Sequence, residues 1–225
     1  MAYPSCNLVV ATDEPDFVAE LKEQIKLHHL NGEVITYETV RPAHARTRLW
    51  NIACGREAVR RHVLSKGAEF LLFLDGDMIF EPSVISIMKS KIKDFEVAFS
   101  GYRGPACGVW VFGNGCLLIN REILSKLTFE CYEFSNGEVI DESEALDWSL
   151  FKCHARVNKG VFVSIKHYWN SRDYYTARPH SVGWFRSLTN NLLLRFILIQ
   201  ISILIRYNIA RKLQSWVYRI PKRLN

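Results

Sequence analysis

The sequence lacks several patterns that would place it in a common class of protein at once. Its six cysteines form no CxxC pair, and together with the seven histidines they show no four-ligand zinc spacing. No N-x-S/T glycosylation sequence occurs, and the N-terminus has no charged segment followed by an apolar run, so we expect no secretory signal. These absences disfavour a structural zinc domain and a secreted glycoprotein, and they favour a catalytic face in the cytoplasm.

Acidic residues are missing from the C-terminal part of the chain. Residues 174–225 contain nine Lys or Arg and no Asp or Glu, whereas residues 1–173 contain twenty basic residues against twenty-three acidic ones. The formal net charge of +6 therefore belongs to the C-terminal part. A basic segment of this kind is expected to meet a membrane surface or another polyanion.

No apolar run reaches the roughly twenty residues that a bilayer crossing needs. The longest, LLLRFILIQISILI from Leu192 to Ile205, has fourteen residues and includes Arg195, Gln200 and Ser202. On a helix, Asn191, Arg195, Ser202 and Arg206 fall on one narrow stripe with wide apolar flanks. The aromatic and basic residues that follow are typical of the membrane interface. We therefore expect residues 181–225 to form amphipathic helices on a membrane surface. A helix packed on the domain or on a second copy, and a single tilted crossing, are the alternatives.

Residues 1–180 alternate between patterns typical of strands and of helices. Apolar residues make up 48% of the whole chain, which is enough for a packed core. The alternation predicts an α/β domain with a mainly parallel central sheet, whose binding groups lie at the carboxyl ends of the strands. The expected strands are Cys6–Ala11, Glu33–Val40, Phe70–Asp75 and Glu96–Ser100, and the expected helices are Asp16–His29, Thr47–Ser65 and one that begins at Pro82.

The second half of the domain is less regular. VWVFGNGCLLIN, from Val109 to Asn120, predicts two short strands around the segment Gly113-Asn114-Gly115. A helix is expected near Arg121–Lys126. EALDWSLFKCHARVNKG predicts an amphipathic helix from Glu144 to Gly160, and VFVSIKHYW predicts a strand from Val161 to Trp169.

The stretch FLLFLDGDMIFEP places two carboxylates, Asp75 and Asp77, directly after an apolar strand. Gly76 between them allows the backbone to bend and a diphosphate to approach closely. Magnesium and manganese ions are typically bound by one or two carboxylates together with substrate phosphates. The pattern therefore predicts a divalent ion that joins the protein to a nucleoside diphosphate. A solvated turn without a ligand is the alternative.

Four segments in order resemble glycosyltransferases with the GT-A fold, in particular the family-2 type, which includes processive cellulose-synthase-like enzymes and dolichol-phosphate sugar transferases. LFLDGDMIFEPSVI resembles the metal-binding D-x-D strand, and ARTRLWNIACGREAV resembles the arginine-rich helix before it. GNGCLLINREIL resembles the acceptor-side glycine segment, and ALDWSLFKCHARVNKGVFVSIKHYW resembles the block with the catalytic carboxylate. The resemblance covers about residues 6–170 and implies a GT-A, Rossmann-like catalytic domain over residues 1–180.

The resemblance also implies roles for single residues. Asp77 is expected to be the direct metal ligand, with Asp75 contacting the ribose or the metal ion through water and His167 completing the site. Asp147 is expected to be the catalytic base, and Glu144 is the alternative. The residues expected on the donor side are Thr12, Asp13, Glu14, Glu38 and Arg48, and those expected on the acceptor side are Gly115 and Trp148.

The implied reaction is a direct displacement at the anomeric carbon that inverts its configuration, with Mn²⁺ or Mg²⁺ as cofactor. Guanosine diphosphate mannose is the favoured donor, because the chain also loosely resembles short membrane-associated archaeal mannosyltransferases; uridine diphosphate sugars are the alternatives. The expected acceptor is a lipid-linked sugar or a glycan at the cytoplasmic membrane surface, as in N-glycan or glycolipid assembly.

Each expected role has a purely structural alternative. Asp147 fits the negative charge that is favourable near a helix N-terminus, and His167 fits an ordinary core histidine. The arginines of the segment Thr47–Arg61 fit a solvated helix face, and Trp110 and Trp148 fit a hydrophobic core. For the whole chain the alternatives are a non-catalytic basic module on a membrane or nucleic acid and a haloacid-dehalogenase-like phosphatase. The D-x-D lies on the third strand rather than the first, which disfavours the phosphatase, and the apolar C-terminal run disfavours a nucleic-acid partner.

Overall fold

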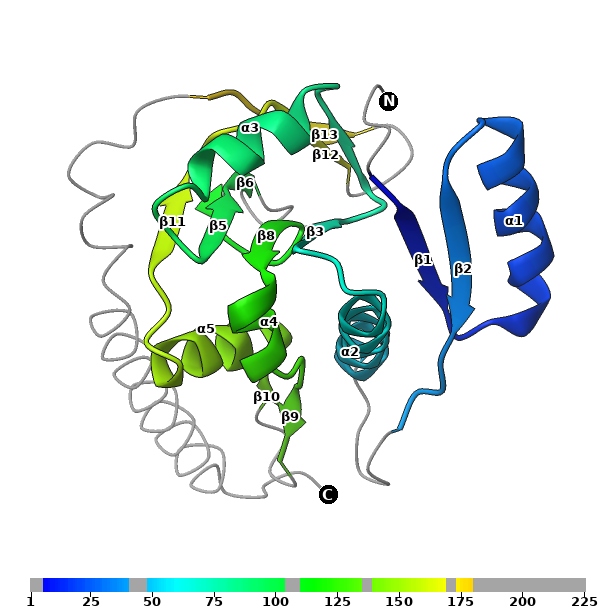
Figure 1. Cartoon of the computed structure of the whole chain (residues 1–225), viewed down its shortest axis with the longest axis horizontal. Helices are drawn as coiled ribbons and strands as arrows, with labels where there is room; N and C mark the ends of the chain where they lie inside the picture. Colours follow the sequence, from blue (N-terminus) through cyan, green and yellow to red (C-terminus); the bar gives the residue numbers. More distant parts are fainter. Residues whose placement is uncertain (1–5, 41–47, 104–109, 135–138, 169–172, 180–225) are drawn as a thin grey trace, which may run out of the picture.

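The computed structural model describes residues 6–40, 48–103, 110–134, 139–168 and 173–179. These residues form a mixed α/β fold, as the alternation of patterns predicts, with parallel and mixed sheets (Figure 1). Within these ranges every helix is too short or too polar to span a lipid bilayer. The amphipathic helices predicted for residues 181–225 lie outside the described residues.

The N-terminal part is a strand–helix–strand unit at one side of the molecule (Figure 1). Its two strands pair in parallel, with Leu8 opposite Gly32, so that their carboxyl ends lie at the same edge. Val18, Leu21 and Ile25, at helical spacing, are the half-buried positions of the intervening helix, and Ile25 packs over Gly32. The elements are β1 (Leu8–Thr12), the 3₁₀ helix η1 (Pro15–Phe17), α1 (Val18–Leu27) and β2 (Gly32–Thr36).

A four-stranded sheet forms the centre of the molecule, in the order β11-β5-β8-β3. Its strands are β3 (Phe70–Leu74), β5 (Val97–Ser100), β8 (Cys116–Asn120) and β11 (Val157–Gly160). Strands β5 and β11 are parallel, whereas β8 runs antiparallel to both of its neighbours. Strands β3, β5 and β11 therefore share one direction, as a mainly parallel sheet requires, and β8 runs against them, which the sequence pattern does not predict.

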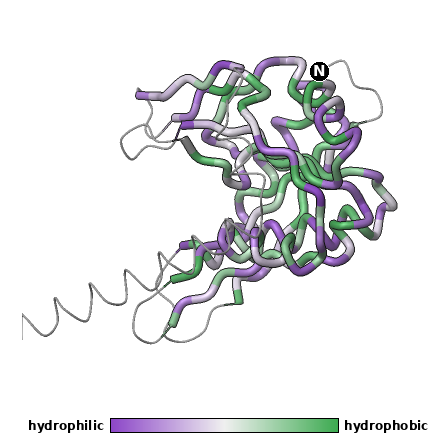
Figure 2. Tube along the Cα trace, turned by 90° about the vertical axis from the view of Figure 1, so that its left-hand side faces the viewer, coloured by the Kyte–Doolittle hydropathy of each residue, from purple (hydrophilic) through white to green (hydrophobic). Residues whose placement is uncertain are grey.

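Alternate residues of the central strands face two hydrophobic layers. One layer contains Phe73, Phe99 and Leu117 and is covered by the helices α2 (Leu49–Ser65), α4 (Arg121–Lys126) and α5 (Glu142–Lys152). The other contains Ala98 and Leu118 and is covered by α3 (Val84–Lys91). Figure 1 shows α3 on one side of the sheet and α4 and α5 on the other, and Figure 2 shows the hydrophobic segments gathered at the centre.

A second, antiparallel sheet in the order β13-β12-β4 lies next to the first. It pairs His167 with Met78, the residue that follows Asp77, and so brings two distant parts of the sequence together. Its strands are β4 (Met78–Phe80), β12 (Ile165–Tyr168) and β13 (Tyr174–Ala177). Two short antiparallel pairs complete the fold, β6 (Tyr102–Arg103) with β7 (Trp110–Val111) and β9 (Tyr132–Glu133) with β10 (Val139–Ile140).

The helix predicted from Glu144 to Gly160 is wrong in its second half. It ends at Lys152, because His154 adopts a left-handed backbone conformation with φ of 51°. The chain then enters the central sheet as β11, where Val157 pairs with Val97 of β5. Lys159 lies in the middle of this buried strand. Its charged side chain interrupts the continuous apolar run that is typical of a parallel strand.

Candidate functional site

The turn between β3 and β4 carries Asp75 and Asp77 at the carboxyl end of β3, as the sequence predicts. The backbone of this turn is held at both aspartates, because the Asp75 N–H donates to the Gly115 carbonyl at 3.1 Å and the Asp77 carbonyl accepts from the Tyr168 N–H at 2.9 Å. The two side chains differ in exposure, at 34% for Asp75 and 59% for Asp77. Asp77 is thus the carboxylate that faces solvent.

Gly76 contributes open space to this turn rather than an unusual backbone conformation. Among the described glycines only Gly67 has a positive φ, so the bend at Gly76 does not itself require glycine. A Cβ built on Gly76 would meet no described atom within 4 Å. Among the described residues, therefore, no side chain or backbone crowds Gly76.

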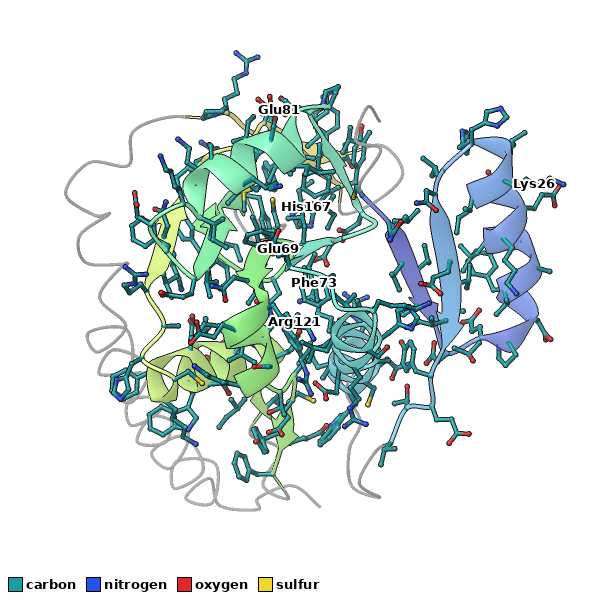
Figure 3. The ribbon with its side chains drawn as sticks, viewed as in Figure 1. Lys26, Glu69, Phe73, Glu81, Arg121 and His167 are labelled. Carbon is teal, nitrogen blue, oxygen red and sulfur yellow. The ribbon has the colours of Figure 1, made fainter. Side chains whose placement is uncertain are left out.

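His167 faces Asp77 from β12, with its Nε2 atom 3.5 Å from Asp77 Oδ2. Its other ring nitrogen, Nδ1, lies 2.7 Å from the Arg103 carbonyl, which only accepts hydrogen bonds, so Nδ1 carries the hydrogen. In the neutral tautomer with this hydrogen, Nε2 carries a lone pair that a metal ion beside Asp77 could take up. The ring is 8% exposed and packs edge-on against Tyr102 at the centre of the molecule (Figure 3). Two electron-pair donors that face each other in this way suit a cation.

The donor atoms at Asp77 and His167 fit a divalent ion that takes its other ligands from a substrate. A metal-binding histidine usually donates its second ring N–H to a carbonyl or carboxylate, as His167 does to Arg103. In the described part of the chain no group of three or more His, Cys, Asp or Glu side chains is arranged to hold a metal ion. One carboxylate and one imidazole would leave most positions on Mn²⁺ or Mg²⁺ for phosphate oxygens and water.

Arg56 of α2 joins Asp75 to α5. Its Nη2 donates to Asp75 Oδ1, and its Nη1 lies 3.1 and 2.9 Å from the two carboxylate oxygens of Glu142. Burial acts to lower the pKa of Arg56, but the charges of Glu142 and Asp75 outweigh burial and raise it. Burial raises the pKa of Glu142 against the opposing effect of Arg56. A charged guanidinium therefore links the D-x-D turn to the first turn of α5.

The sequence leaves open that the arginines of α2 simply form a solvent-exposed helix face. The structure shows such a face along only part of the helix. The side chains of Arg56 and Arg60 are 12% and 11% exposed, and only Arg61, at 74%, points mainly into solvent. Arg60 is ion-paired with Glu57 at 2.7 Å. The hydrophobic pattern of a helix counts every arginine as polar. It does not identify which arginines contact a buried carboxylate.

The segment from Gly113 to Gly115 lies against the D-x-D turn. A Cβ added to Gly115 would lie 2.7 Å from Asp75 Oδ2 and 2.6 Å from Met78 Cε, so only glycine fits here without displacing the carboxylate. Asn114 is 2% exposed; it acts to lower the pKa of Glu142, but neither polar atom of its carboxamide has a hydrogen bond of good geometry within the described structure. Gly115, expected on the acceptor side, is placed behind Asp75.

Replacing Gly115 with alanine should lower the free energy of unfolding by about 1–3 kcal/mol, because the new methyl group overlaps Asp75 and Met78. The matched control is Gly76→Ala, whose methyl group enters open space and should change that free energy by less than about 0.5 kcal/mol. Urea denaturation of both variants measures the difference. Equal stability of the two variants would contradict the close contact between Gly115 and Asp75.

The expected base, Asp147, lies in a buried ion pair. Its Oδ1 is 2.9 Å from Lys159 Nζ, and the two residues are 7% and 1% exposed. Lys159 also lies over the ring of Phe99 at 4.5 Å. The alternative base, Glu144, is half-buried on the same helix, and its backbone N–H is capped by Asp141. The α5 carboxylate that connects to Asp75 through Arg56 is Glu142, which sequence reasoning did not select.

Trp148, expected on the acceptor side, lies on the outer surface of α5. It is 38% exposed and stacks on Phe151 with ring centroids 5.7 Å apart, while Lys152 lies over its ring at 4.8 Å. It is therefore not a core residue, and its aromatic face is partly covered by its own helix.

Of the residues expected on the donor side, Asp13 joins the end of β1 to the segment after β2 and to the start of α2. Asp13 Oδ2 accepts from Asn51 Nδ2 at 2.8 Å and from Thr39 Oγ1 at 3.1 Å, so the ends of both strands and the start of α2 converge. Thr12 Oγ1 accepts from the Glu14 N–H at 3.1 Å, which fixes the turn after β1. The side chains of Glu14, Glu38 and Arg48 are exposed, and Arg48 stands at the N-terminus of α2.

Sequence reasoning missed four polar residues that these contacts involve, Thr39, Asn51, Arg56 and Glu142. The nearest signal is on α2, where Asn51 and Arg56 interrupt the apolar positions of the helix. No protein-family model, curated protein or solved structure matches this chain.

Proposed function

We propose that this protein is a metal-dependent, inverting glycosyltransferase of the GT-A type, with guanosine diphosphate mannose as the favoured donor. The observation that carries the proposal is the pairing of Asp77 with His167 at the end of β3. An exposed carboxylate and an imidazole nitrogen face each other at 3.5 Å, and the other ring nitrogen donates to the Arg103 carbonyl, the arrangement usual for a metal-binding histidine. The four sequence segments that resemble GT-A enzymes support the same reaction class.

In this proposal Asp77 and His167 hold the metal ion, and Asp75 accepts hydrogen bonds from ribose or sugar hydroxyl groups. The ion, when bound, offsets the negative charge that grows on the leaving diphosphate. The cluster of Asp13, Thr39 and Asn51 offers carboxylate, hydroxyl and amide groups at the ends of β1 and β2, where an α/β fold binds its nucleotide. The other residues proposed on the donor side lie near this cluster in the sequence: Thr12, Glu14, Glu38 and Arg48.

Helix α5 supplies the proposed base for the acceptor hydroxyl group. Asp147 remains our assignment and Glu144 the alternative, since both lie on this helix. Asp147 Oδ1 contacts Lys159 Nζ at 2.9 Å, so a base at this position would take its proton on a carboxylate that already has a cationic partner. Comparing kcat for Asp147→Asn with kcat for Glu144→Gln separates the two assignments.

The acceptor in this proposal is a lipid-linked sugar or a glycan at the cytoplasmic face of a membrane. Residues 181–225 contain the apolar and basic residues that would hold the domain there. Their role concerns where the enzyme works, and the catalytic proposal does not depend on it.

The test is release of nucleoside diphosphate from a panel of sugar nucleotides, with membranes as the source of acceptor. Guanosine diphosphate mannose and the uridine diphosphate derivatives of glucose, galactose and N-acetylglucosamine are each incubated with Mn²⁺, Mg²⁺ or a chelator. We expect release from one donor, its loss on chelation and its return with excess Mn²⁺. Absence of release from every donor, with liposome binding retained, would replace the proposal with a non-catalytic membrane module.

A further inference from the structure

We propose that Arg56 is a positioning residue that holds Asp75 away from the metal ion, which makes Asp77 the direct carboxylate ligand. This inference rests on the proposed function, because it concerns the metal site of that reaction. What it adds is the residue that separates the tasks of the two aspartates.

The first support is the geometry of the Arg56 side chain. One guanidinium nitrogen binds Oδ1 of Asp75, and the other lies within 3.1 Å of both oxygens of Glu142. A guanidinium is planar and rigid, so engagement at both ends fixes its position between the D-x-D turn and α5. The side chains of Arg56 and Glu142 are only 12% and 6% exposed, so solvent screens this contact little.

The second support is the position of the other Asp75 oxygen. Oδ2 lies so close to Gly115 that a Cβ there would be only 2.7 Å away, and the Asp75 N–H is bonded to the Gly115 carbonyl. One carboxylate oxygen is therefore engaged by a cation and the other is packed against backbone. The exposures agree with this division, at 34% for Asp75 against 59% for Asp77.

The third support is charge. A divalent cation that approached Asp75 would have to displace Arg56 or accept its repulsion at close range. Asp77 faces His167 instead, and within the described part of the chain no arginine or lysine forms an ion pair with it. Removing Arg56 should therefore release a second carboxylate for the ion and tighten metal binding. A purely structural role for Arg56 would make the site looser and metal binding weaker.

The test measures the dissociation constant of Mn²⁺ by electron paramagnetic resonance of the free ion, with the full-length chain and Mn²⁺ alone. The informative variant is the double substitution Arg56→Gln with Glu142→Gln, because it removes the guanidinium without leaving Glu142 as an uncompensated buried charge. We expect this variant to bind Mn²⁺ about tenfold more tightly than the wild type. Adding Asp75→Asn to it should return the dissociation constant to the wild-type value.

Two further variants make the result unambiguous. Arg56→Lys keeps the positive charge but cannot bridge both carboxylates, so its affinity for Mn²⁺ should lie between those of the wild type and the double variant. Asp77→Asn should lose Mn²⁺ binding. Suppose that binding of Mn²⁺ by the wild type depends on Asp77, but the folded double variant binds Mn²⁺ no more tightly than the wild type. This result would overturn the role of Arg56 and leave the proposed function standing. If the wild type does not bind Mn²⁺, or if Asp77→Asn binds it equally well, both the role of Arg56 and the proposed function are overturned.

Discussion

Replacing Asp77 with asparagine should lower kcat/KM for nucleoside diphosphate release by at least about a hundredfold, because changes to residues that merely support metal ligands already cost up to that much. Asparagine has the same shape but no charge, and it is a poor ligand for Mn²⁺ beside His167. The side chain is 59% exposed, so the free energy of unfolding should change by less than about 0.5 kcal/mol. Steady-state kinetics with the active donor and urea denaturation measure the two quantities.

The matched control is Asp94→Asn, the same chemical change at an exposed aspartate after α3. It should leave both kcat/KM and stability at wild-type values. His167→Gln should give a loss of about ten- to a hundredfold, because the charged ligand Asp77 remains. Full activity of Asp77→Asn in the presence of metal ion would remove the basis for the proposed site.

The largest effect on stability is expected at Lys159. Replacing it with methionine should lower the free energy of unfolding by about 3–5 kcal/mol, because it leaves the Asp147 carboxylate buried without its partner. The lysine side chain is 0% exposed and that of Asp147 is 8% exposed, so water cannot compensate for the loss. The double variant Lys159→Met with Asp147→Leu should recover most of the lost stability. Urea denaturation that follows the midpoint and the slope of the transition measures each value.

This ion pair also decides how Asp147→Asn must be interpreted. The substitution removes the proposed base, but it also leaves Lys159 buried opposite a neutral side chain. Kinetics should therefore be measured at a temperature where the variant remains folded, with stability determined in parallel. Loss of kcat in a fully folded Asp147→Asn supports the base assignment. Wild-type kcat in that folded variant would move the assignment to Glu144.

The sequence predicts the features of this protein that depend on local pattern. The alternation of strands and helices, the D-x-D at the end of β3 and the two strands around Gly113–Gly115 all follow from runs of a few residues, and the structure confirms their positions. The antiparallel direction of β8 and the strand β11 do not follow from such runs. Because Lys159 is charged, the sequence of β11 does not look like a buried strand and is predicted as part of a helix. Its ion pair with Asp147 explains why a lysine can be buried there.

The sequence also does not predict the contacts that define the candidate site, because they join residues that lie far apart in the chain. Arg56 and Glu142 are 86 residues apart, and Asp13 and Asn51 are 38 apart, so no periodic pattern connects them. Charge alone presents Arg56 and Arg61 as similar helix residues, although one is buried between two carboxylates and the other is exposed. Only the packing of α2 against β3 and α5 distinguishes them.

The central claim is that the turn carrying Asp77, together with His167, holds a divalent ion against a nucleoside diphosphate. Titration calorimetry of the active nucleoside diphosphate with and without Mn²⁺ tests it most directly. We expect binding at least about tenfold tighter with Mn²⁺ in the wild type, since the ion's charge meets both the phosphates and Asp77. That gain should disappear in Asp77→Asn. Equal affinity with and without the ion, or a gain that survives in Asp77→Asn, would mean that Asp77 does not hold a metal ion against the diphosphate.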